Sequence, residues 1–472
     1  MLVPTIGIEV HVELKSKTKV YSDSLNNFSN DMNTNVNVID LGYPGTLPKL
    51  NKEVINMALK AALALNCEIN QTMYFDRKNY FYPDLPKGYQ ITQSKTPIGI
   101  NGYLEIMVNG VSKKVLIERL HIEEDTCKSI HSFEGTLLNF NRAGVPLIEI
   151  VTKPVIESEA EAVAYIEALR EILLYLEISD VKIEEGSMRC DANVSLKEAG
   201  SLVLGTKTEI KNIGSITNVA TSISYEINRQ TEILSRGELV IDETRRFDDK
   251  TNTTILMRVK ETGNDYRYLP DPDIPKVSIS DEWINEIKAK LPVLPQTLRL
   301  KYQTLGISEN NIKTILINHE LCLFLEQVIA DVNPVIAANL LTGDIISYLN
   351  KNNQLLSTTK LDQTNFKDLV DAVANNLISS KQAKEVLPVL LKEGGSLQDL
   401  INELGLSQIS DNDALEAIIS KVIIDNPAAI IDYKNGLDRA LKYLMGQIMK
   451  ESKGQANPQI VNKMLIDTLD KC

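Results

Sequence analysis

Apolar and polar residues alternate strictly near the start of the chain, a pattern typical of a strand buried on one side. In residues 5–14, one face of the predicted strand consists of Ile6, Ile8, Val10, Val12 and Leu14. Successive side chains of a strand point to opposite faces, so the other face consists of Gly7, Glu9, His11 and Glu13. Residues 188–196 alternate in the same way, and their polar face consists of Arg189, Asp191, Asn193 and Ser195. Both segments predict half-buried strands that expose chemically useful side chains.

Three other segments have the spacing of amphipathic helices, at residues 52–66, 158–176 and 215–235. Ser158 is placed to cap the second helix, with Glu161 three residues later, and together they predict a capping box. Gly237 is a suitable end for the third helix.

The rhythm changes at the proline-containing segment 271–275, and from about Leu294 onward the pattern is helical almost throughout. A chain of 472 residues is too long for one ordinary core. We therefore predict an α+β fold with three domains. These are a mixed sheet-and-helix catalytic domain at residues 1–293, a helical linker domain at 294–407 and a small helical tail domain at 408–472.

The distribution of charge differs at the C-terminal end of the chain. The chain carries a formal charge of −13, which disfavours nucleic acid, but the charge is not uniform. Residues 391–432 contain two lysines against eight acidic residues, whereas residues 433–472 contain seven basic residues against four acidic ones. A basic end on an acidic body is expected of an appendage that binds a polyanion. On charge alone, a solvated helical face is the more frequent explanation.

Several absences narrow the functional class. The five cysteines are far apart and odd in number, which argues against a disulfide framework or a zinc knuckle. We expect a cytoplasmic bacterial protein without a membrane span, because no long apolar run or targeting segment occurs. There is no P-loop motif and no recognisable nucleophile with a base, so we expect the chain not to release ammonia from glutamine unaided.

Two carboxylates among apolar neighbours are candidate ligands of a metal ion. Glu124 continues the apolar face of the predicted strand 116–125, and Glu149 does so in residues 145–151. Buried carboxylates need a cation or hydrogen-bond donors. Together with the Glu9/His11 face they could converge on Mg²⁺, and a histidine ligand would also admit Mn²⁺. The alternative is that each glutamate pairs with a lysine or arginine.

A second polar face suits a phosphorylated ligand. In residues 205–212, Lys207, Glu209 and Lys211 share a face. Together with the polar face of 188–196, this segment presents arginine, lysine, carboxylate and amide groups. Arginine and lysine neutralise phosphate charge, while Asp and Asn position metals or hydroxyls. A solvated outer face with cross-strand pairs is an equally good explanation at this point.

Longer motifs make the chain similar to a known family over essentially its whole length. They are GIEVHVEL (7–14), FDRKNYFYPDLPKGYQITQ (75–93), HIEEDTCKS (121–129), NRAGVPLIEIVTKP (141–154), MRCDANVSL (188–196), GTKTEIKN (205–212), ETRRFD (243–248), DYRYLPDPDIP (265–275) and GQANPQIVNKML (454–465). The chain resembles the B subunits of bacterial glutamyl/aspartyl-tRNA amidotransferases. The resemblance implies a cradle-shaped catalytic domain, a helical domain and a tail that grips tRNA.

The resemblance also implies an activity and partners. The family works as a heterotrimer with an amidase (glutaminase) subunit and a small bridging subunit. It uses ATP to phosphorylate the side-chain carboxylate of Glu on tRNA(Gln) or Asp on tRNA(Asn), and ammonia from the amidase then displaces phosphate. This is the chemistry of a carbon–nitrogen ligase. Bringing two anions together requires cations and a metal.

Site roles follow from the resemblance, residue by residue. It implies His11, Glu124 and Glu149 as Mg²⁺ ligands, and Tyr80 as part of the pocket. The catalytic set would be Glu9, His11, Lys78, Tyr82, Arg189 and Asp191. ATP would be bound by Lys87, Asn193 and Lys207, and the tRNA backbone by Lys450, Lys453 and Lys463. For Lys78, a structural ion pair is the alternative.

One departure from the family concerns zinc. Many members carry a Cys-x-Cys and a Cys-x-x-Cys near the N-terminus, whereas the matching positions here are Ser22, Ser24, Asn37 and Asp40. None is a thiolate, so no zinc is expected.

Two rival functions remain at this point. A non-catalytic tRNA-binding scaffold would have no use for converging metal ligands. A small-molecule carboxylate–amine ligase would leave the basic tail unexplained.

Overall fold

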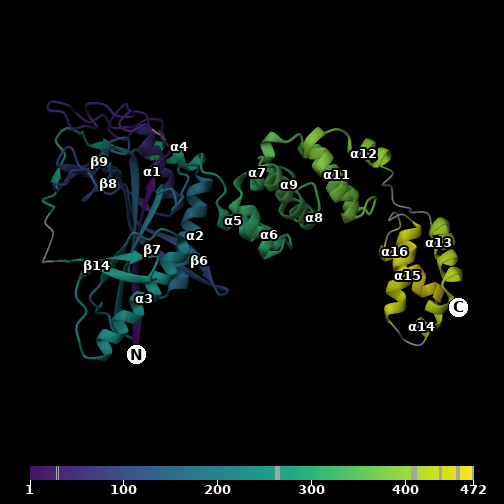
Figure 1. Cartoon of the computed structure of the whole chain (residues 1–472). Helices are drawn as coiled ribbons and strands as arrows, with labels where there is room; N and C mark the ends of the chain where they lie inside the picture. The colour runs from purple at the N-terminus through teal and green to yellow at the C-terminus, as the bar shows by residue number, and fades with distance from the viewer. Residues whose placement is uncertain are drawn as a thin grey trace. The chain divides into compact units, whose positions relative to one another are not determined.

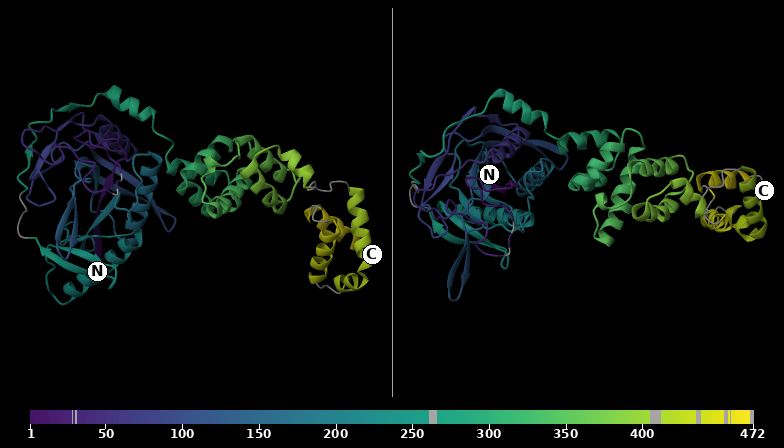
Figure 2. Two further views of the ribbon diagram at one scale, coloured as in Figure 1. Left: turned by 45° about the horizontal axis from the view of Figure 1, so that its top comes forward. Right: turned by 90° about the horizontal axis from the view of Figure 1, so that it is seen from above.

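The computed structural model describes residues 1–469 except 28, 30, 261–265, 405–411, 435–437, 453–455 and 457. It divides into two compact units, Met1–Pro295 and Gln296–Cys472. Figure 2 shows that the named strands belong to the first unit and that the second consists of helices. The predicted α+β class is therefore confirmed.

A nine-stranded sheet forms the frame of the first unit (Figure 1). Its strands lie in the order β14 (Thr253–Val259), β13 (Glu243–Asp248), β12 (Thr208–Lys211), β11 (Met188–Glu198), β1 (Leu2–Glu13), β10 (Pro146–Thr152), β7 (Val111–Glu124), β6 (Gly99–Val108) and β2 (Glu68–Ile69). The described pairings are antiparallel except for β12 with β13. The N-terminal strand thus lies at the centre, where its side chains meet those from both halves of the sheet.

One face of this sheet carries the hydrophobic core. The alternating residues predicted for the first strand, from Ile6 to Val12, are fully buried there. Three helices that contact the sheet contribute to this core: α1 (Lys52–Ala64), α2 (Glu159–Tyr175) and α3 (Ile216–Ser235). Because side chains alternate, the polar residues of β1 must emerge on the opposite face. That face carries the candidate site.

Smaller elements of the first unit complete the frame. A three-stranded sheet has the order β15 (Leu269–Pro270), β4 (Asp76–Asn79) and β5 (Tyr89–Thr92). Two-stranded sheets join β16 (Val277–Ser278) to β3 (Thr72–Met73) and β8 (Lys128–Ser132) to β9 (Gly135–Asn139). Helix α4 (Asp281–Ala289) carries Trp283, whose indole Nε1 donates to Asn56 Oδ1 at 2.9 Å.

The predicted start of α2 is correct, but its capping box forms only in half. The Ser158 hydroxyl accepts from the Glu161 backbone N–H at 3.2 Å, as expected of an N-cap. The Glu161 carboxylate does not return to Ser158. It accepts from the Glu157 N–H at 2.8 Å and from Lys113 Nζ at 2.8 Å. Lys113 on β7 therefore binds the Glu161 carboxylate in place of the Ser158 backbone, and this contact links the start of α2 to the sheet.

The second unit contains helices of one to four turns. Their bounds are α5 (Pro295–Thr304), α6 (Glu309–Ile317), α7 (His319–Val328), α8 (Pro334–Asn339), the π-helical η1 (Leu340–Ile345), α9 (Ile346–Asn352), the 3₁₀ turn η2 (Leu356–Thr358), α10 (Gln363–Ala374), α11 (Ser380–Glu393), α12 (Leu397–Glu403), α13 (Asn412–Asp425), α14 (Pro427–Lys434), α15 (Asp438–Glu451) and α16 (Pro458–Leu469). Helices α13 to α16 share an apolar cluster that includes Leu415, Leu444 and Leu465. The predicted boundary at 407 lies outside the described residues and stays a prediction. In the described part of the chain, no helix is long and apolar enough to span a membrane.

Candidate active site

The register of three neighbouring strands brings polar residues together on the face opposite the core. His11 of β1 lies opposite Glu149 of β10, and Glu149 lies opposite His121 of β7. Glu123 follows two residues after His121, so it emerges on the same face. Four ionisable side chains from three strands therefore form one cluster.

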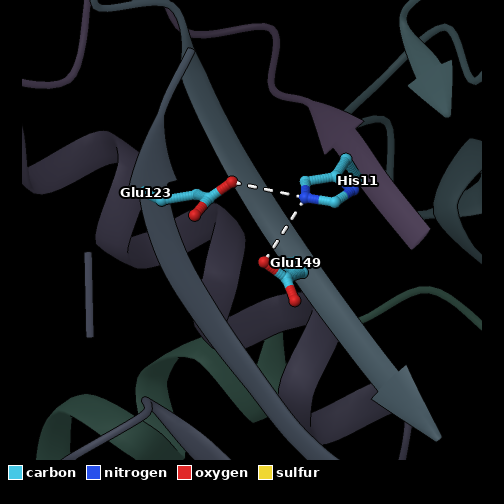
Figure 3. A group of neighbouring side chains, drawn as sticks. All are labelled: His11, Glu123 and Glu149. Atoms are coloured by element: carbon cyan, nitrogen blue, oxygen red, sulfur yellow. Dashed lines mark ion pairs between the residues drawn. The ribbon is translucent and has the colours of Figure 1, made fainter. Parts of the chain in front are cut away.

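The distances within this cluster suit a divalent metal. His11 Nε2 lies 3.5 Å from Glu123 Oε1 and 3.3 Å from Glu149 Oε2 (Figure 3). Figure 3 shows one nitrogen of the imidazole facing two carboxylates that come from different strands. The three ligand atoms lie within 4.8 Å of one another. Two carboxylate oxygens and one imidazole nitrogen are a donor set that Mg²⁺ or Mn²⁺ accepts.

His121 is a buried counter-charge to the same carboxylates. Its Nε2 lies 3.3 Å from Glu149 Oε2 and 3.8 Å from Glu123 Oε2. Burial alone would lower the pKa of His121, but Glu149 and Glu123 outweigh burial and raise that pKa to about 9. Burial would raise the pKa of Glu149, but His121 and His11 hold it well below its usual range. The cluster is thus charged, with acids and histidines that stabilise one another.

A second acidic group lies beside the first and is already neutralised. Glu9, Asp191 and Glu209 bring carboxylate oxygens within 4.8 Å of one another. Lys211 Nζ lies 2.6 Å from Asp191 and 2.9 Å from Glu209, and Lys260 Nζ lies 2.8 Å from Glu209. Burial would raise the pKa of Glu209, yet these lysines lower it to about 2. By contrast, burial and the charges of Glu149 and Asp191 raise the pKa of Glu9.

Both groups border one cavity of about 650 Å³. It is lined by Glu9, His11, Lys78, Thr92, Gln93, Ser94, Arg119, His121, Glu123, Glu149, Lys207, Glu209, Lys211, Asp242, Arg258, Lys260, Tyr266 and Tyr268. Cations on or beside β12 and β14 line the cavity on one side of β1. Residues of β4, β5 and the segment of the two tyrosines, which belong to or adjoin the separate three-stranded sheet, also line it, and β5 contacts β7. The His11 cluster lies on β1, β10 and β7. Such a cavity suits a large ligand with several negative charges.

The structure separates one predicted metal ligand, Glu124, from the other two. Glu124 does not join His11 and Glu149, because it lies opposite Pro146 on the core side of β7. There its carboxylate accepts from Lys87 Nζ at 2.6 Å and from the Ile91 N–H at 2.9 Å. Its neighbour Glu123 reaches the cluster, since a shift of one residue in a strand changes the face. Glu124 thus pairs with a lysine, as the alternative expectation describes.

Other predicted residues divide into three groups. Lys78 and Lys207 line the cavity with Glu9, His11 and Glu149. Asp191 contacts Lys211, and Asn193 Nδ2 donates to Glu9 Oε1 at 2.9 Å, so both support the cavity wall. Three residues lie outside the lining: Lys87 binds Glu124, Arg189 Nη2 lies 2.5 Å from Asp125 Oδ2, and Tyr82 is 69% exposed on a separate surface hollow.

Several lining residues were missed from the sequence. His121 and Glu123 could have been found, because Leu120 and Ile122 mark the core face and the residues between and after them must face away. Arg258 and Lys260 on and beside the edge strand, and Tyr266 and Tyr268 after it, offer no such signal. Their place in the cavity depends on strand pairing between distant segments.

The four positions that match family cysteines form a hydrogen-bonded cluster. Asp40 Oδ1 accepts from the Ser22 hydroxyl at 2.7 Å, and Oδ2 accepts from Ser24 at 2.5 Å and from the Asn37 N–H at 3.0 Å. The buried Lys19 ammonium lies 3.4 Å from the same carboxylate. One carboxylate thus links the two segments that carry these four positions.

The predicted tRNA-binding lysines belong to the second unit. Lys450 lies on α15 and Lys463 on α16, and both are exposed. Lys453 lies outside the described residues. Exposed lysines suit contacts to a phosphate backbone, but their role remains a proposal.

Comparison with known proteins gives the family. Residues 4–285 match the family model described as the GatB/GatE catalytic domain, and residues 323–469 match the one described as the GatB domain. A protein of Geobacillus thermodenitrificans is 48% identical over 469 residues, covering 99% of this chain and 98% of the relative. Proteins of Lysinibacillus sphaericus and Enterococcus faecalis are each 47% identical, with the same coverage. Each of the three is named as the B subunit of an aspartyl/glutamyl-tRNA(Asn/Gln) amidotransferase. The chain therefore belongs to the family of aspartyl/glutamyl-tRNA amidotransferase B subunits.

Proposed function

We propose that this protein activates the side-chain carboxylate of Glu or Asp on a misacylated tRNA by phosphorylating it with ATP. Its family makes it one component of a tRNA-dependent amidotransferase, a ligase that acts within a complex. The observation that carries the proposal is the His11–Glu123–Glu149 cluster, because it lies in a cavity whose other charged residues are mostly cations. A tRNA-binding scaffold has no use for this arrangement, so catalysis is favoured.

The proposed reaction has two balanced steps. A carboxylate oxygen of the aminoacyl side chain attacks the γ-phosphorus of ATP, the bond to the β-phosphate oxygen breaks, and ADP leaves. Ammonia then attacks the carbonyl carbon of the acyl phosphate, phosphate leaves with its bonding electron pair, and nitrogen gives up one proton. Phosphorylation is needed because a free carboxylate is a poor electrophile with a poor leaving group.

The residues of the cavity fit this chemistry. His11, Glu123 and Glu149 would hold Mg²⁺, which when bound neutralises phosphate charge. Lys207 and Arg258 would bind the polyphosphate, together with the lysines already paired to Glu209. Lys78 is charged, since Glu123 and Glu149 outweigh its burial and raise its pKa, so it would orient the second anion, the carboxylate.

Partners and location follow from the same proposal. The relatives are named as B subunits, so we propose a heterotrimer with an amidase that supplies ammonia and a small bridging protein. Because the product serves translation, we propose a cytoplasmic location. Zinc has no part in the proposal, since the carboxylate of Asp40 is occupied by donors.

The test is phosphate release by the reconstituted complex. We expect release from ATP and Mg²⁺ to require glutamyl- or aspartyl-tRNA, and to stay low with uncharged tRNA. Release that does not depend on the aminoacyl group, or no release although the tRNA binds, would favour the scaffold. Amide formation on each misacylated tRNA then shows which substrate is used.

A second prediction concerns the tail. Replacing Lys450, Lys453 and Lys463 with alanine should weaken tRNA binding and reduce the slope of log affinity against log salt concentration by about 2 to 3, as three phosphate contacts are lost. The matched control replaces three exposed lysines on other helices, Lys313, Lys351 and Lys381. Filter binding over a salt series measures both slopes. Equal slopes for the two triple variants would show that the three tail lysines do not contact tRNA phosphates.

A further inference from the structure

Three tyrosines lie in or beside the candidate active site, and the proposed reaction does not use them: Tyr80, Tyr266 and Tyr268. Tyr266 and Tyr268 come from the DYRYLPDPDIP motif and line the cavity. The Asn79 backbone N–H donates to the Tyr266 carbonyl at 2.9 Å, and Asn79 Nδ2 donates to the Arg267 carbonyl at 2.7 Å. Leu269 then pairs with β4. The tyrosines are therefore held against the strand that carries Lys78.

The three rings pack edge to face, and the ring of Tyr268 stays partly exposed. Centroids of Tyr80 and Tyr266 lie 6.2 Å apart with planes at 70°, and those of Tyr266 and Tyr268 lie 5.9 Å apart at 67°. Lys78 Nζ lies 5.0 Å from the Tyr266 centroid, which fixes that ring as a support. Tyr268, by contrast, is 43% exposed. The outcome is a supported aromatic ring exposed in an otherwise polar cavity.

A supported and exposed tyrosine suits a flat ligand. Nucleic-acid bases at single-stranded ends are commonly bound by stacking on aromatic side chains. Both substrates of the proposed reaction contain adenine, one in ATP and one in the 3′-terminal adenosine that carries the amino acid. The number of cations favours one placement. Lys207, Lys211, Arg258 and Lys260 line the cavity on or beside β12 and β14, whereas Lys78 and Arg119 are the lysine and arginine that act on Tyr268.

We propose that Tyr268, supported by Tyr266, stacks on the 3′-terminal adenine of the aminoacyl-tRNA. This inference rests on the proposed function. The triphosphate carries the greater local negative charge and takes the cationic side of the cavity. The aminoacyl group is joined through a ribose to the terminal base, so a base stacked on Tyr268 directs the carboxylate toward Lys78 and the cluster beyond it. Tyr268 is thus a positioning residue for the acceptor end.

Steady-state kinetics of the reconstituted complex separate the two sources of adenine. Tyr268→Ala should raise KM for aminoacyl-tRNA by roughly 5- to 100-fold, the range expected for loss of one stacked base, while KM for ATP stays within about twofold. Tyr268→Phe keeps the ring and should behave like the wild type. Tyr268→Leu keeps apolar bulk without a stacking face and should behave like Tyr268→Ala. The matched control is Tyr103→Ala, which removes a ring that also lies beneath a lysine, Lys114 at 4.3 Å, but outside the cavity lining.

A spectroscopic arm tests stacking directly. With 2-aminopurine in place of the terminal adenine of the tRNA, binding should quench its fluorescence in the wild type and Tyr268→Phe, but not in Tyr268→Ala. The same fluorophore in the nucleoside triphosphate should give no difference among these variants. A rise in KM for ATP with an unchanged KM for tRNA would assign the ring to ATP and overturn the proposal, as would unchanged values for both. In either case the wild type still releases phosphate in a tRNA-dependent way, so this failure differs from failure of the proposed function.

Discussion

Replacing Glu149 with glutamine is expected to slow tRNA-dependent phosphate release by about 10²- to 10³-fold, the size of effect seen when one preorganised electrostatic group is removed. Glu149 lies at the centre of the cluster, 3.3 Å from both His11 and His121. Glutamine keeps the shape but removes the negative charge that a divalent ion requires. The affinity of the complex for Mn²⁺, followed by electron paramagnetic resonance, should fall by at least about 10-fold.

Glu124→Gln provides the matched control, because it makes the same change on the adjacent strand of the sheet but on the opposite face. Its carboxylate is bound by Lys87 and the Ile91 N–H. We therefore expect Mn²⁺ affinity to stay within about twofold of the wild type, although the contact with Lys87 is weakened. A loss of Mn²⁺ binding in Glu124→Gln but not in Glu123→Gln would restore the set expected from the sequence and reject the cluster described here.

The neighbouring group of Glu9, Asp191 and Glu209 does not compromise this test. Lys211 and Lys260 already neutralise two of those carboxylates at distances of 2.6 to 2.9 Å. A divalent ion there would have to displace or repel both lysines. The first Mn²⁺ ion is therefore expected at the His11 cluster. Titrating the complex with up to one equivalent of Mn²⁺ then measures the contribution of Glu149 to binding at that cluster.

The elements with strong periodicity were predictable because local pattern and tertiary structure agree. The alternation of residues 5–14 became the central strand β1, and the helical spacing of 158–176 became α2 with Ser158 as its cap. Each has a polar and an apolar face, and the apolar face joins the core. Glu161 differs because Lys113, a distant residue, provides a better partner than the helix end.

Residues of the candidate site could be predicted only where the alternation along a single strand shows which face of the sheet each side chain joins. Glu9 and His11 lie on the predicted polar face and line the cavity, since every second residue of β1 is apolar. Glu118 interrupts the pattern in β7, and the pairing of β10 with β7 shifts between Val151 and Thr152, opposite that part of the strand. Across such an irregularity the alternation changes face, so Leu116 is 39% exposed although Leu120 and Ile122 are fully buried. No periodicity could place Tyr266 beside Lys78, because that contact joins segments almost 200 residues apart in the sequence.

The largest stability effect is expected at Asp40, the acceptor at the centre of the cysteine-matching positions. Asp40 is 6% exposed, and its partner Lys19 is fully buried. Burial lowers the pKa of Lys19, whereas Asp40 acts in the opposite direction and favours the charged ammonium. Asp40→Ala would leave a buried ammonium without its counter-ion and two serine hydroxyls without an acceptor. Loss of one partner from a buried pair costs about 3 to 5 kcal/mol.

Tryptophan fluorescence during urea unfolding measures this effect in the first unit, because Trp283 on α4 is the protein's single tryptophan. The matched control is Asp23→Ala in the same segment, which breaks an exposed pair with Lys49 at 2.8 Å and should cost less than about 1 kcal/mol. The double variant Lys19→Met/Asp40→Leu removes both charges and should recover much of the lost stability, since apolar replacement of a buried pair is often neutral. If Asp40→Ala costs no more than Asp23→Ala, the carboxylate does not hold this segment. If added zinc stabilises the wild type, the four polar side chains bind zinc, and the hydrogen-bonded cluster does not take the place of a metal site.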